Sequence, residues 1–351
     1  MVKPTNSQIH GTFVHDEKNF DRKKSDVLML GVAFDLTASY NVGTWHGPLA
    51  IIDASYQIEY GVPVLKTQLT DKINIHSVGI LEYKKSEQKE LELEEINKVS
   101  ETMVEDVKRE ALQAFEENKF LMTFGGDHSI PNGIFQAMKQ KFESKNVTII
   151  QFDAHTDLWK DFHGQKYSHA SIMTNAKTLG FPLIQIGIRD HMGEEEHKLI
   201  DKYNLKEQMF FCATMPKKLY EELNALNENL IFDSVVSEKM IQKIVSQIKT
   251  KHVYISLDID VLDSSVIQGT GTPLPHGLNL AALEKIIFEI ISFCKKNNIN
   301  FLGFDLVEVS PQLKEEIDYY DAKNCVSNST EMIAALIAYK ILYWNYLERF
   351  R

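Results

Sequence analysis

The segment 147–157 constrains the fold most, because it joins a buried strand to polar residues that alternate along the chain. Residues 147–150 form an apolar, β-branched run that is typical of a strand buried on both faces. Asp153, His155 and Asp157 then occupy every second position. Alternate residues of an extended chain point to one face, so two carboxylates and one imidazole project together. This donor set suits a divalent metal of intermediate hardness.

Two other segments repeat this arrangement of a strand followed by residues that can bind a metal. The apolar run 253–257 precedes Asp258 and Asp260, whose carboxylates share one face. The run 120–124 leads through a pair of glycines to His128. Ligands of open parallel α/β sheets bind at the carboxyl ends of the strands. We therefore expect all six donors to meet at one edge of a sheet.

Strand patterns alternate with helical patterns along most of the chain. This alternation predicts an α/β fold with a mainly parallel central sheet that helices cover on both faces. Loops are expected at 36–48, 158–170 and 269–277. The expected strands are 27–34, 73–80, 120–124, 147–153, 182–188, 209–212, 229–232, 253–258 and 301–307. Two helices are expected to begin at Pro48 and after Ser129. Six more are expected at 90–118, 171–179, 216–226, 237–250, 280–297 and 329–349. The last of these has a capping box of Asn328 and Glu331.

Composition limits the class of protein. A net charge of −11 argues against nucleic acid or an anionic membrane as a partner, and the last helix is too short an apolar run to span a bilayer. The three cysteines are scattered, which favours a reducing, cytoplasmic location, and residues 1–20 lack the apolar centre of a signal peptide. We expect an N-terminal arm at 1–25 and a single domain at 26–351.

The metal interpretation has simpler rivals when each motif is taken alone. The alternating acids could cap a helix or lie on a solvated turn, and a histidine after two glycines is often structural. Together, however, the four carboxylates of this six-donor set, crowded with two imidazoles at neighbouring strand ends, would repel one another without cations. Six protein ligands suit two ions better than one, and bridging carboxylates such as Asp157 or Asp258 would hold them roughly 3.5–4 Å apart. The dominance of carboxylates and the absence of cysteine favour two Mn²⁺ over Zn²⁺.

With these motifs the chain resembles the ureohydrolase family, which includes arginase, agmatinase and formimidoylglutamase. Gly-Gly-Asp-His-Ser at 125–129, Asp-Ala-His-Thr-Asp at 153–157 and Ser-Leu-Asp-Ile-Asp at 256–260 look like the three metal motifs of that family, in family order. The resemblance covers about residues 26 to 345. It implies a binuclear manganese hydrolase with a three-layer α/β/α fold that assembles as a trimer or hexamer. It assigns one ion to His128, Asp153, Asp157 and Asp258, and the other to Asp153, His155, Asp258 and Asp260.

The resemblance also implies a residue that receives the substrate. Segment 304–311 resembles the family segment whose glutamate, here Glu308, pairs with a guanidinium. A carboxylate can accept two parallel hydrogen bonds from that planar cation. The simpler alternative is an ordinary acid at the end of a strand.

A histidine that transfers protons is expected in the loop after the central motif. His169, in Tyr-Ser-His-Ala-Ser, stands where agmatinases have this histidine. His163 is a rival, because arginases have a His-Gly pair at that point. Either could instead be an ordinary loop histidine, and we prefer His169.

The substrate is predicted from two departures from the arginase pattern. Trp159 replaces the asparagine that in arginases helps hold the substrate's α-carboxylate, and only Lys160 in 158–162 is basic. Segments 31–55 and 185–189 also look agmatinase-like. In the loop 266–278, His276 replaces the first of a usual glycine pair, either as a surface substitution or as a substrate contact.

These features predict an amidinohydrolase that releases urea from a small cationic guanidino compound, with agmatine as the first choice. In this interpretation Asp157 orients the attacking water, Glu308 positions the guanidinium, and His169 assists protonation of the departing amine, with Trp159 and His276 as further candidates for substrate contact. Arginase, guanidinobutyrase, guanidine hydrolase and formimidoylglutamase remain alternatives. So does an inactive metal-binding paralogue that acts as a partner protein, although no ligand is missing.

Overall fold

The computed structural model describes residues 13–15, 21–58, 69, 72–83, 91–223, 225–313, 325–326 and 329–347. Within these residues no helix is both long and apolar enough to cross a membrane.

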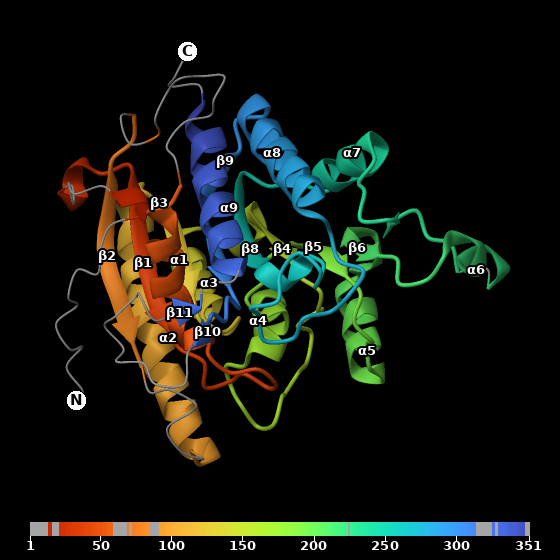
Figure 1. The fold of residues 1–351 in the computed structure, drawn as a ribbon, viewed down its shortest axis with the longest axis horizontal. Coiled ribbons are helices and arrows are strands. Elements are labelled where there is room, and N and C mark those ends of the chain that lie inside the picture. The colour runs from red at the N-terminus through yellow and green to blue at the C-terminus, as the bar shows by residue number, and fades with distance from the viewer. Residues whose placement is uncertain are drawn as a thin grey trace.

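One sheet of nine strands forms the centre of the molecule (Figure 1). Every pair of neighbouring strands in it is parallel, and the order is β2-β1-β3-β9-β8-β4-β5-β6-β7. The predicted α/β fold with a mainly parallel sheet is therefore confirmed. The strands are β1 (Val27–Ala33), β2 (Ile75–Glu82), β3 (Phe120–Gly125), β4 (Val147–Phe152), β5 (Leu183–Ile188), β6 (Met209–Cys212), β7 (Leu230–Ile231), β8 (His252–Asp258) and β9 (Asn300–Val307).

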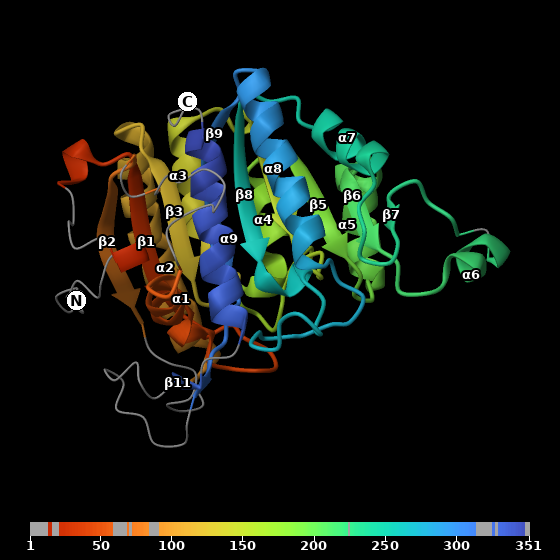
Figure 2. The ribbon, with the colours of Figure 1, turned by 45° about the horizontal axis from the view of Figure 1, so that its top comes forward.

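Helices cover both faces of this sheet. In Figure 2, α8 (Leu280–Lys296) and α9 (Ser329–Tyr346) lie in front of it, and α2 (Leu93–Glu116) and α3 (Pro131–Lys141) lie behind it. Two separate apolar clusters result, one on each face. The remaining helices are α1 (Gly47–Ser55) and α7 (Glu238–Ser246), which join the front cluster, α4 (Ile172–Thr178) and α5 (Glu194–Tyr203), which join the rear cluster, and α6 (Lys217–Glu222), which projects from the body.

The continuous apolar strands follow from this double coverage. In β4, Ile150 and Phe152 belong to the front cluster, whereas Val147 and Ile149 belong to the rear cluster. All four side chains are fully buried. Because successive side chains of a strand point to opposite faces, a strand between two helical layers needs mostly apolar residues on both of its faces.

Some elements differ from the sequence prediction. The strands match it closely, but α5 was not predicted, and the two-residue strands β10 (Gln312–Leu313) and β11 (Cys325–Val326) were not predicted either. The first helix begins at Gly47, so Pro48 is its second residue. Helices α6 and α7 are shorter than predicted. Asn328 of the predicted capping box lies outside the described residues, as does most of the predicted arm at 1–25.

Candidate active site

The predicted metal ligands meet at the carboxyl ends of neighbouring strands in the middle of the sheet. The strands β3, β9, β8 and β4 are adjacent in that order. His128 follows β3, Glu308 follows β9, Asp258 ends β8, and Asp153 follows β4. Parallel strands bring all their carboxyl ends to one edge, so residues far apart in the sequence become neighbours here.

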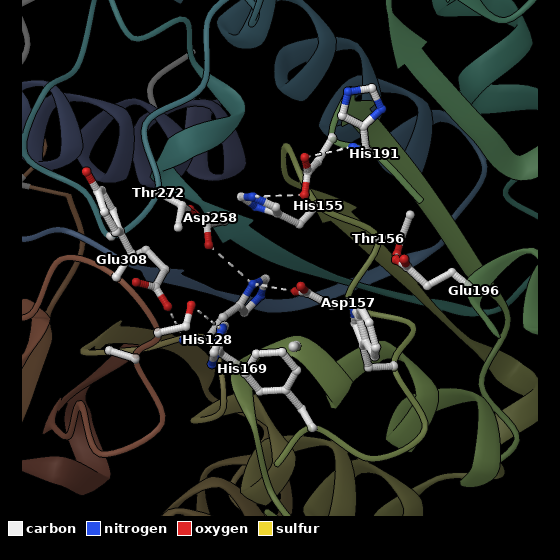
Figure 3. A pocket seen from close by; sticks show the side chains of 18 of the residues that line it. His128, His155, Thr156, Asp157, His169, His191, Glu196, Asp258, Thr272 and Glu308 are labelled. Atoms are coloured by element: carbon white, nitrogen blue, oxygen red, sulfur yellow. Dashed lines mark hydrogen bonds and ion pairs between the residues drawn. The ribbon is translucent and has the colours of Figure 1, made fainter. Parts of the chain in front are cut away.

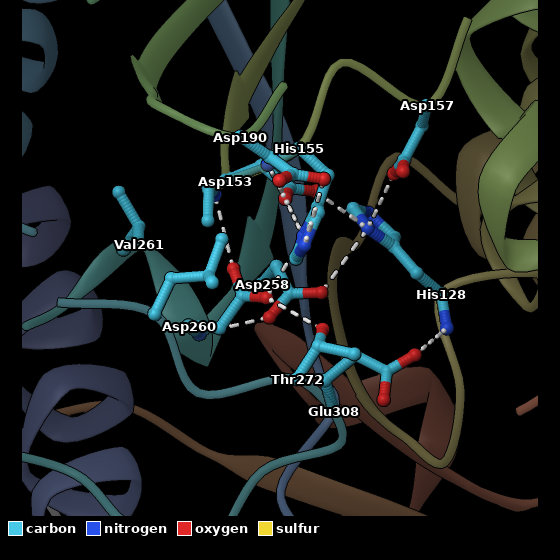
Figure 4. Close-up of polar contacts among 12 residues, drawn as sticks. His128, Asp153, His155, Asp157, Asp190, Asp258, Asp260, Val261, Thr272 and Glu308 are labelled. Atoms are coloured by element: carbon cyan, nitrogen blue, oxygen red, sulfur yellow. Dashed lines mark hydrogen bonds and ion pairs between the residues drawn. The ribbon is translucent and has the colours of Figure 1, made fainter. Parts of the chain in front are cut away.

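Two groups of side chains at this edge could each hold a metal ion. The first ligand group is His128, Asp153 and Asp258, and the second ligand group is Asp153, His155 and Asp260. Within each group the candidate ligand atoms lie within 4.8 Å of one another. Asp153 belongs to both groups and is the shared residue (Figure 4).

The distances show how closely carboxylate oxygens surround each imidazole. His128 Nδ1 lies 3.0 Å from Asp153 Oδ2, 3.1 Å from Asp157 Oδ2 and 3.4 Å from Asp258 Oδ2. His155 Nδ1 lies 3.3 Å from Asp153 Oδ1 and 3.0 Å from Asp260 Oδ2. All six predicted donors therefore converge, and Asp157 approaches the first ligand group from outside it. Whether Asp258 also reaches a second ion stays a prediction.

The electrostatics of these residues fit bound cations. Burial raises the pKa of Asp157 to about 7, with the neighbouring Asp153 adding to the effect. Burial also raises the pKa of Asp258 well above its usual range, and repulsion from Asp260 and Asp153 contributes to this rise. Carboxylates so placed ionise together only if positive charge lies among them. His128 Nδ1 is buried and, within the described part of the chain, makes no hydrogen bond of good geometry, so it is placed to bind an ion.

A chain of buried hydrogen bonds fixes the orientation of the His128 ring. Ser256 Oγ donates to Asp305 Oδ1 at 2.9 Å, so the same oxygen can accept a hydrogen bond from His128 Nε2–H, also at 2.9 Å. A proton on Nε2 leaves Nδ1 as the bare nitrogen that faces the carboxylates. Such outer partners commonly set the tautomer of a metal-binding histidine.

An amide pair holds the shared carboxylate and its neighbour. Gln151 Nε2 donates to Asp153 Oδ2 at 2.7 Å and to Asp157 Oδ2 at 3.1 Å. Gln185 Nε2 in turn donates to Gln151 Oε1 at 2.6 Å. These side chains are fully buried, so the carboxylates are set before any ligand arrives.

A pocket of about 250 Å³ opens above the ligand groups (Figure 3). Its polar base contains His128, Asp157, Asp258 and Glu308. Its wall includes Trp159, Phe162, His169, Asp190 and Glu196, together with the loop residues 38–41. The site is thus open to a small molecule from one side.

Glu308 lies at the pocket base in a constrained backbone conformation. Its φ is +63°, which is uncommon for a residue with a side chain. Its Oε1 accepts a hydrogen bond from the His128 backbone N–H at 2.8 Å. At Gly271 an added Cβ would lie 2.9 Å from Glu308 Oε2, so the glycine leaves room beside that oxygen. One oxygen is therefore anchored, and the other lies beside Gly271, which also lines the pocket.

His169 lines the pocket, whereas its rival His163 does not. His169 Nε2 lies 3.3 Å from Ser39 Oγ, and its backbone N–H donates to Thr37 Oγ1 at 3.1 Å. Burial, followed by positive charge on His155 and His128, lowers the pKa of His169 to about 4. His163 is exposed.

The two remaining candidates for substrate contact lie in different places. Trp159 lines the pocket and is 37% exposed. His276 is exposed, has a φ of +64° and is not among the residues that line the described pocket. A left-handed backbone favours glycine, so a residue with a side chain is strained at this position. Lys160 is exposed and does not line the pocket either.

Several supporting residues were not predicted from the sequence. Ser256 and Asp305 stand inside motifs that were recognised, but only the sheet brings them to His128. Gln151 and Gln185 are amides in otherwise apolar strands, and that mismatch was the available signal. Glu196 is buried in α5, where it accepts a hydrogen bond from Thr156 beside the metal motif.

Comparison with known proteins agrees with this geometry. A profile of the Arginase family matches residues 25–343. N(1)-aminopropylagmatine ureohydrolase of Thermus thermophilus is 29% identical over 298 residues, which cover 85% of this chain and 87% of that protein. Agmatinase of Bacillus subtilis is 30% identical over 292 residues, which cover 82% of this chain and 85% of that protein. The solved structure of agmatine ureohydrolase from Thermoplasma volcanium has the same fold, with a TM-score of 0.65 and 24% identity. The match covers 93% of this chain and 92% of that chain. The chain therefore belongs to the Arginase family of metal-dependent ureohydrolases, which hydrolyse amidine C–N bonds.

Proposed function

We propose that this protein is a binuclear manganese amidinohydrolase that converts agmatine and water to putrescine and urea. The observation that carries the proposal is the pair of ligand groups that share Asp153 at the base of a pocket, beside Glu308. The donors are imidazoles and carboxylates, which suit Mn²⁺. An inactive paralogue is disfavoured, because every predicted ligand is in place.

Manganese bound by these residues would supply Lewis-acid activation of water and stabilisation of developing negative charge. Asp157 accepts a hydrogen bond from the attacking water and orients it toward the guanidinium carbon. Glu308 offers its free oxygen to the guanidinium and places that carbon above the ligand groups. His169 is neutral at pH 7 because its pKa is about 4, so it must take up a proton before it can pass one to the departing amine.

The charge of the pocket favours a substrate without a carboxylate. Among the described residues, no lysine or arginine lines the pocket. With the guanidinium at Glu308, the α-carboxylate of arginine would lie at the other end of the pocket, against the Trp159 ring or beside the acidic Asp190 and Glu196. A buried charge without a partner commonly costs several kcal/mol. Agmatine lacks that carboxylate and retains two cationic ends, which suit an acidic pocket.

A longer guanidino amine is the second candidate. Asp190 and Glu196 also line the pocket, and Glu196 lies on the other side of the site from Glu308 (Figure 3). A second or third amine could reach this acidic side. N(1)-aminopropylagmatine, the compound in the name of the Thermus thermophilus relative, has this chemistry.

Two further proposals concern the state of the protein in the cell. We propose a homo-oligomer, a trimer or hexamer, as the resemblance implies, and a cytoplasmic location. Sedimentation velocity of the purified, Mn²⁺-loaded protein tests the first of these. A monomer at micromolar concentration would contradict it.

The substrate proposal is tested by urea release under one Mn²⁺ condition with agmatine, N(1)-aminopropylagmatine, arginine and 4-guanidinobutyrate. We expect kcat/KM for agmatine to exceed that for arginine at least a hundredfold, because about 3 kcal/mol of lost binding corresponds to roughly two orders of magnitude. A higher value for N(1)-aminopropylagmatine would identify the second candidate as the substrate. Equal values for arginine and agmatine would refute the argument from pocket charge.

A further inference from the structure

Arg189, the residue after β5, is held entirely by backbone oxygens in the described part of the chain. Its side chain donates to six carbonyl oxygens. The shortest bonds run from Nη2 to Asp260 O at 2.7 Å, from Nη2 to Leu274 O at 2.9 Å, and from Nε to Pro275 O at 2.9 Å. The others, from 3.2 to 3.4 Å, go to Leu262 O, Val261 O and Gly187 O.

These carbonyls belong to three segments that are separate in the sequence. One is the end of β5, the second is the turn 260–262, and the third is the loop at 274–275. The turn carries the metal-ligand candidate Asp260. The loop carries Thr272, which lines the pocket and donates to Asp260 Oδ2 at 3.4 Å. One guanidinium therefore joins a ligand of the second group to the adjacent pocket wall.

The backbone of Arg189 extends this connection to the central motif. Its N–H donates to Ala154 O at 2.9 Å, and the N–H of Ala154 donates to Asp260 Oδ1 at 3.0 Å. Arg189 thus lies between Asp260 and the segment that carries Asp153 and His155. Arg189 thus donates directly to the backbone of Asp260, and it donates to the backbone of Ala154, the chain neighbour of Asp153 and His155.

The chemistry of the guanidinium explains why an arginine is needed. A planar fork with five N–H donors can serve several carbonyls in fixed directions, whereas the ammonium of lysine is a point charge with three rotatable donors. Hydrogen bonds from a charged donor are stronger than neutral ones. Carbonyls that lose such a partner inside the protein lose free energy unless they move to find another.

The first ligand group has different supports. Its members are held by Gln151 and by the pair Ser256–Asp305, as described above. None of the described hydrogen bonds of the Arg189 side chain reaches His128, Asp153 or Asp258. The two groups therefore differ in most of their supports, although they share Asp153 and the Asp260 backbone N–H also donates to Asp258 Oδ1 at 2.8 Å.

We propose that Arg189 is a positioning residue for the second ligand group: it fixes Asp260 and the Thr272 wall so that a second ion binds beside the first. This inference rests on the proposed function, since it assumes that the two groups hold metal. It adds that the sites depend on different residues and can be weakened separately.

The test compares the wild type with Arg189→Lys, which keeps the charge and loses the fork. Arg22→Lys is the matched control, because Arg22 forms a half-buried ion pair with Glu117 at 3.0 Å, outside the site. Mn²⁺ is titrated into metal-free protein, and free Mn²⁺ is followed by its electron paramagnetic resonance signal. In Arg189→Lys one of the two binding steps should lose about 10–100-fold in affinity, as is usual for outer-shell changes, while the other step changes less than about threefold. Arg22→Lys should match the wild type.

The outcomes separate this inference from the proposed function. A wild type that binds fewer than two Mn²⁺ would refute the proposed function itself. A wild type with two ions and an Arg189→Lys variant with unchanged affinities, or with both steps weakened equally, would overturn the role of Arg189 alone. If Arg189→Lys does not fold, Thr272→Val removes only the bond from the loop to Asp260. That variant should weaken the same single step, and equal weakening of both steps would again overturn the inference.

Discussion

The base of the pocket and its rim are built in different ways. At the base, Asp153 is fully buried and accepts hydrogen bonds from Gln151 and from the His155 backbone N–H. At the rim, Trp159 is 37% exposed and Tyr40 is 73% exposed. A buried, hydrogen-bonded base can hold charged groups in fixed positions, whereas an exposed rim can change without disturbing the fold. We therefore expect changes at the base to alter metal content and kcat, and changes at the rim to alter KM and substrate choice.

The largest effect is expected for Asp153→Ala, because Asp153 belongs to both ligand groups. The variant should bind neither ion tightly and should lose activity by more than the roughly 10–100-fold that outer-shell changes cause. Asp258→Ala should likewise lose metal and activity together. Metal analysis and urea release check both variants. Full activity with one tightly held zinc ion would contradict the binuclear account.

The second effect concerns proton transfer at the wall. His169→Ala should lower kcat by roughly 10²–10⁴-fold, the usual contribution of general acid–base catalysis, without changing Mn²⁺ content. His163→Ala is the control, because His163 is exposed and does not line the pocket. Reversed effects in the two variants would show that the wrong histidine was assigned.

The third effect is a pH dependence of stability in the metal-free protein. The pKa of His169 is lowered to about 4 in the folded state, first by burial. Between pH 6.5 and 4 the unfolded chain therefore binds a proton that the folded chain does not, and stability falls as the pH falls. His169→Gln should make this decline shallower, by up to about 1.4 kcal/mol per pH unit. Denaturant unfolding at pH 6 and pH 5 measures the slope, and equal slopes would contradict the assignment.

The smallest effect is expected for His276→Gly at the exposed loop. Because His276 has a φ of +64°, glycine should relieve backbone strain and stabilise the fold by up to about 1 kcal/mol. Since His276 does not line the described pocket, kcat/KM for agmatine should stay within about twofold, a change worth less than 1 kcal/mol. A large change in KM would restore His276 as a substrate contact.

The base of the site could be predicted from sequence because its signal is local. Asp153, His155 and Asp157 alternate directly after a strand, so their direction follows from strand geometry alone. The strand order that brings His128 next to Asp258 could not be read from any local pattern. It depends on which helix packs on which face, and so Ser256 and Asp305 were recognised as supports only in the folded chain.

The elements that were missed have weak local patterns. Helix α5 has three glutamates in its first turn, and its buried apolar residues are only Leu199 and Ile200. That pattern resembles a solvated loop as much as an amphipathic helix. The strands β10 and β11 each have two residues and pair with each other, so only the folded chain defines them. The role of the rim residues is harder to predict from the sequence, because these residues are exposed and few physical constraints act on their identity.

The most direct test of the central claim is a crystal structure of the Mn²⁺-loaded protein with anomalous data collected at the manganese absorption edge. The account predicts two anomalous peaks about 3.5–4 Å apart, the separation of a two-metal site. One peak should lie among His128, Asp153 and Asp258, and the other among Asp153, His155 and Asp260. A single peak, or manganese bound away from Asp153, would contradict the account.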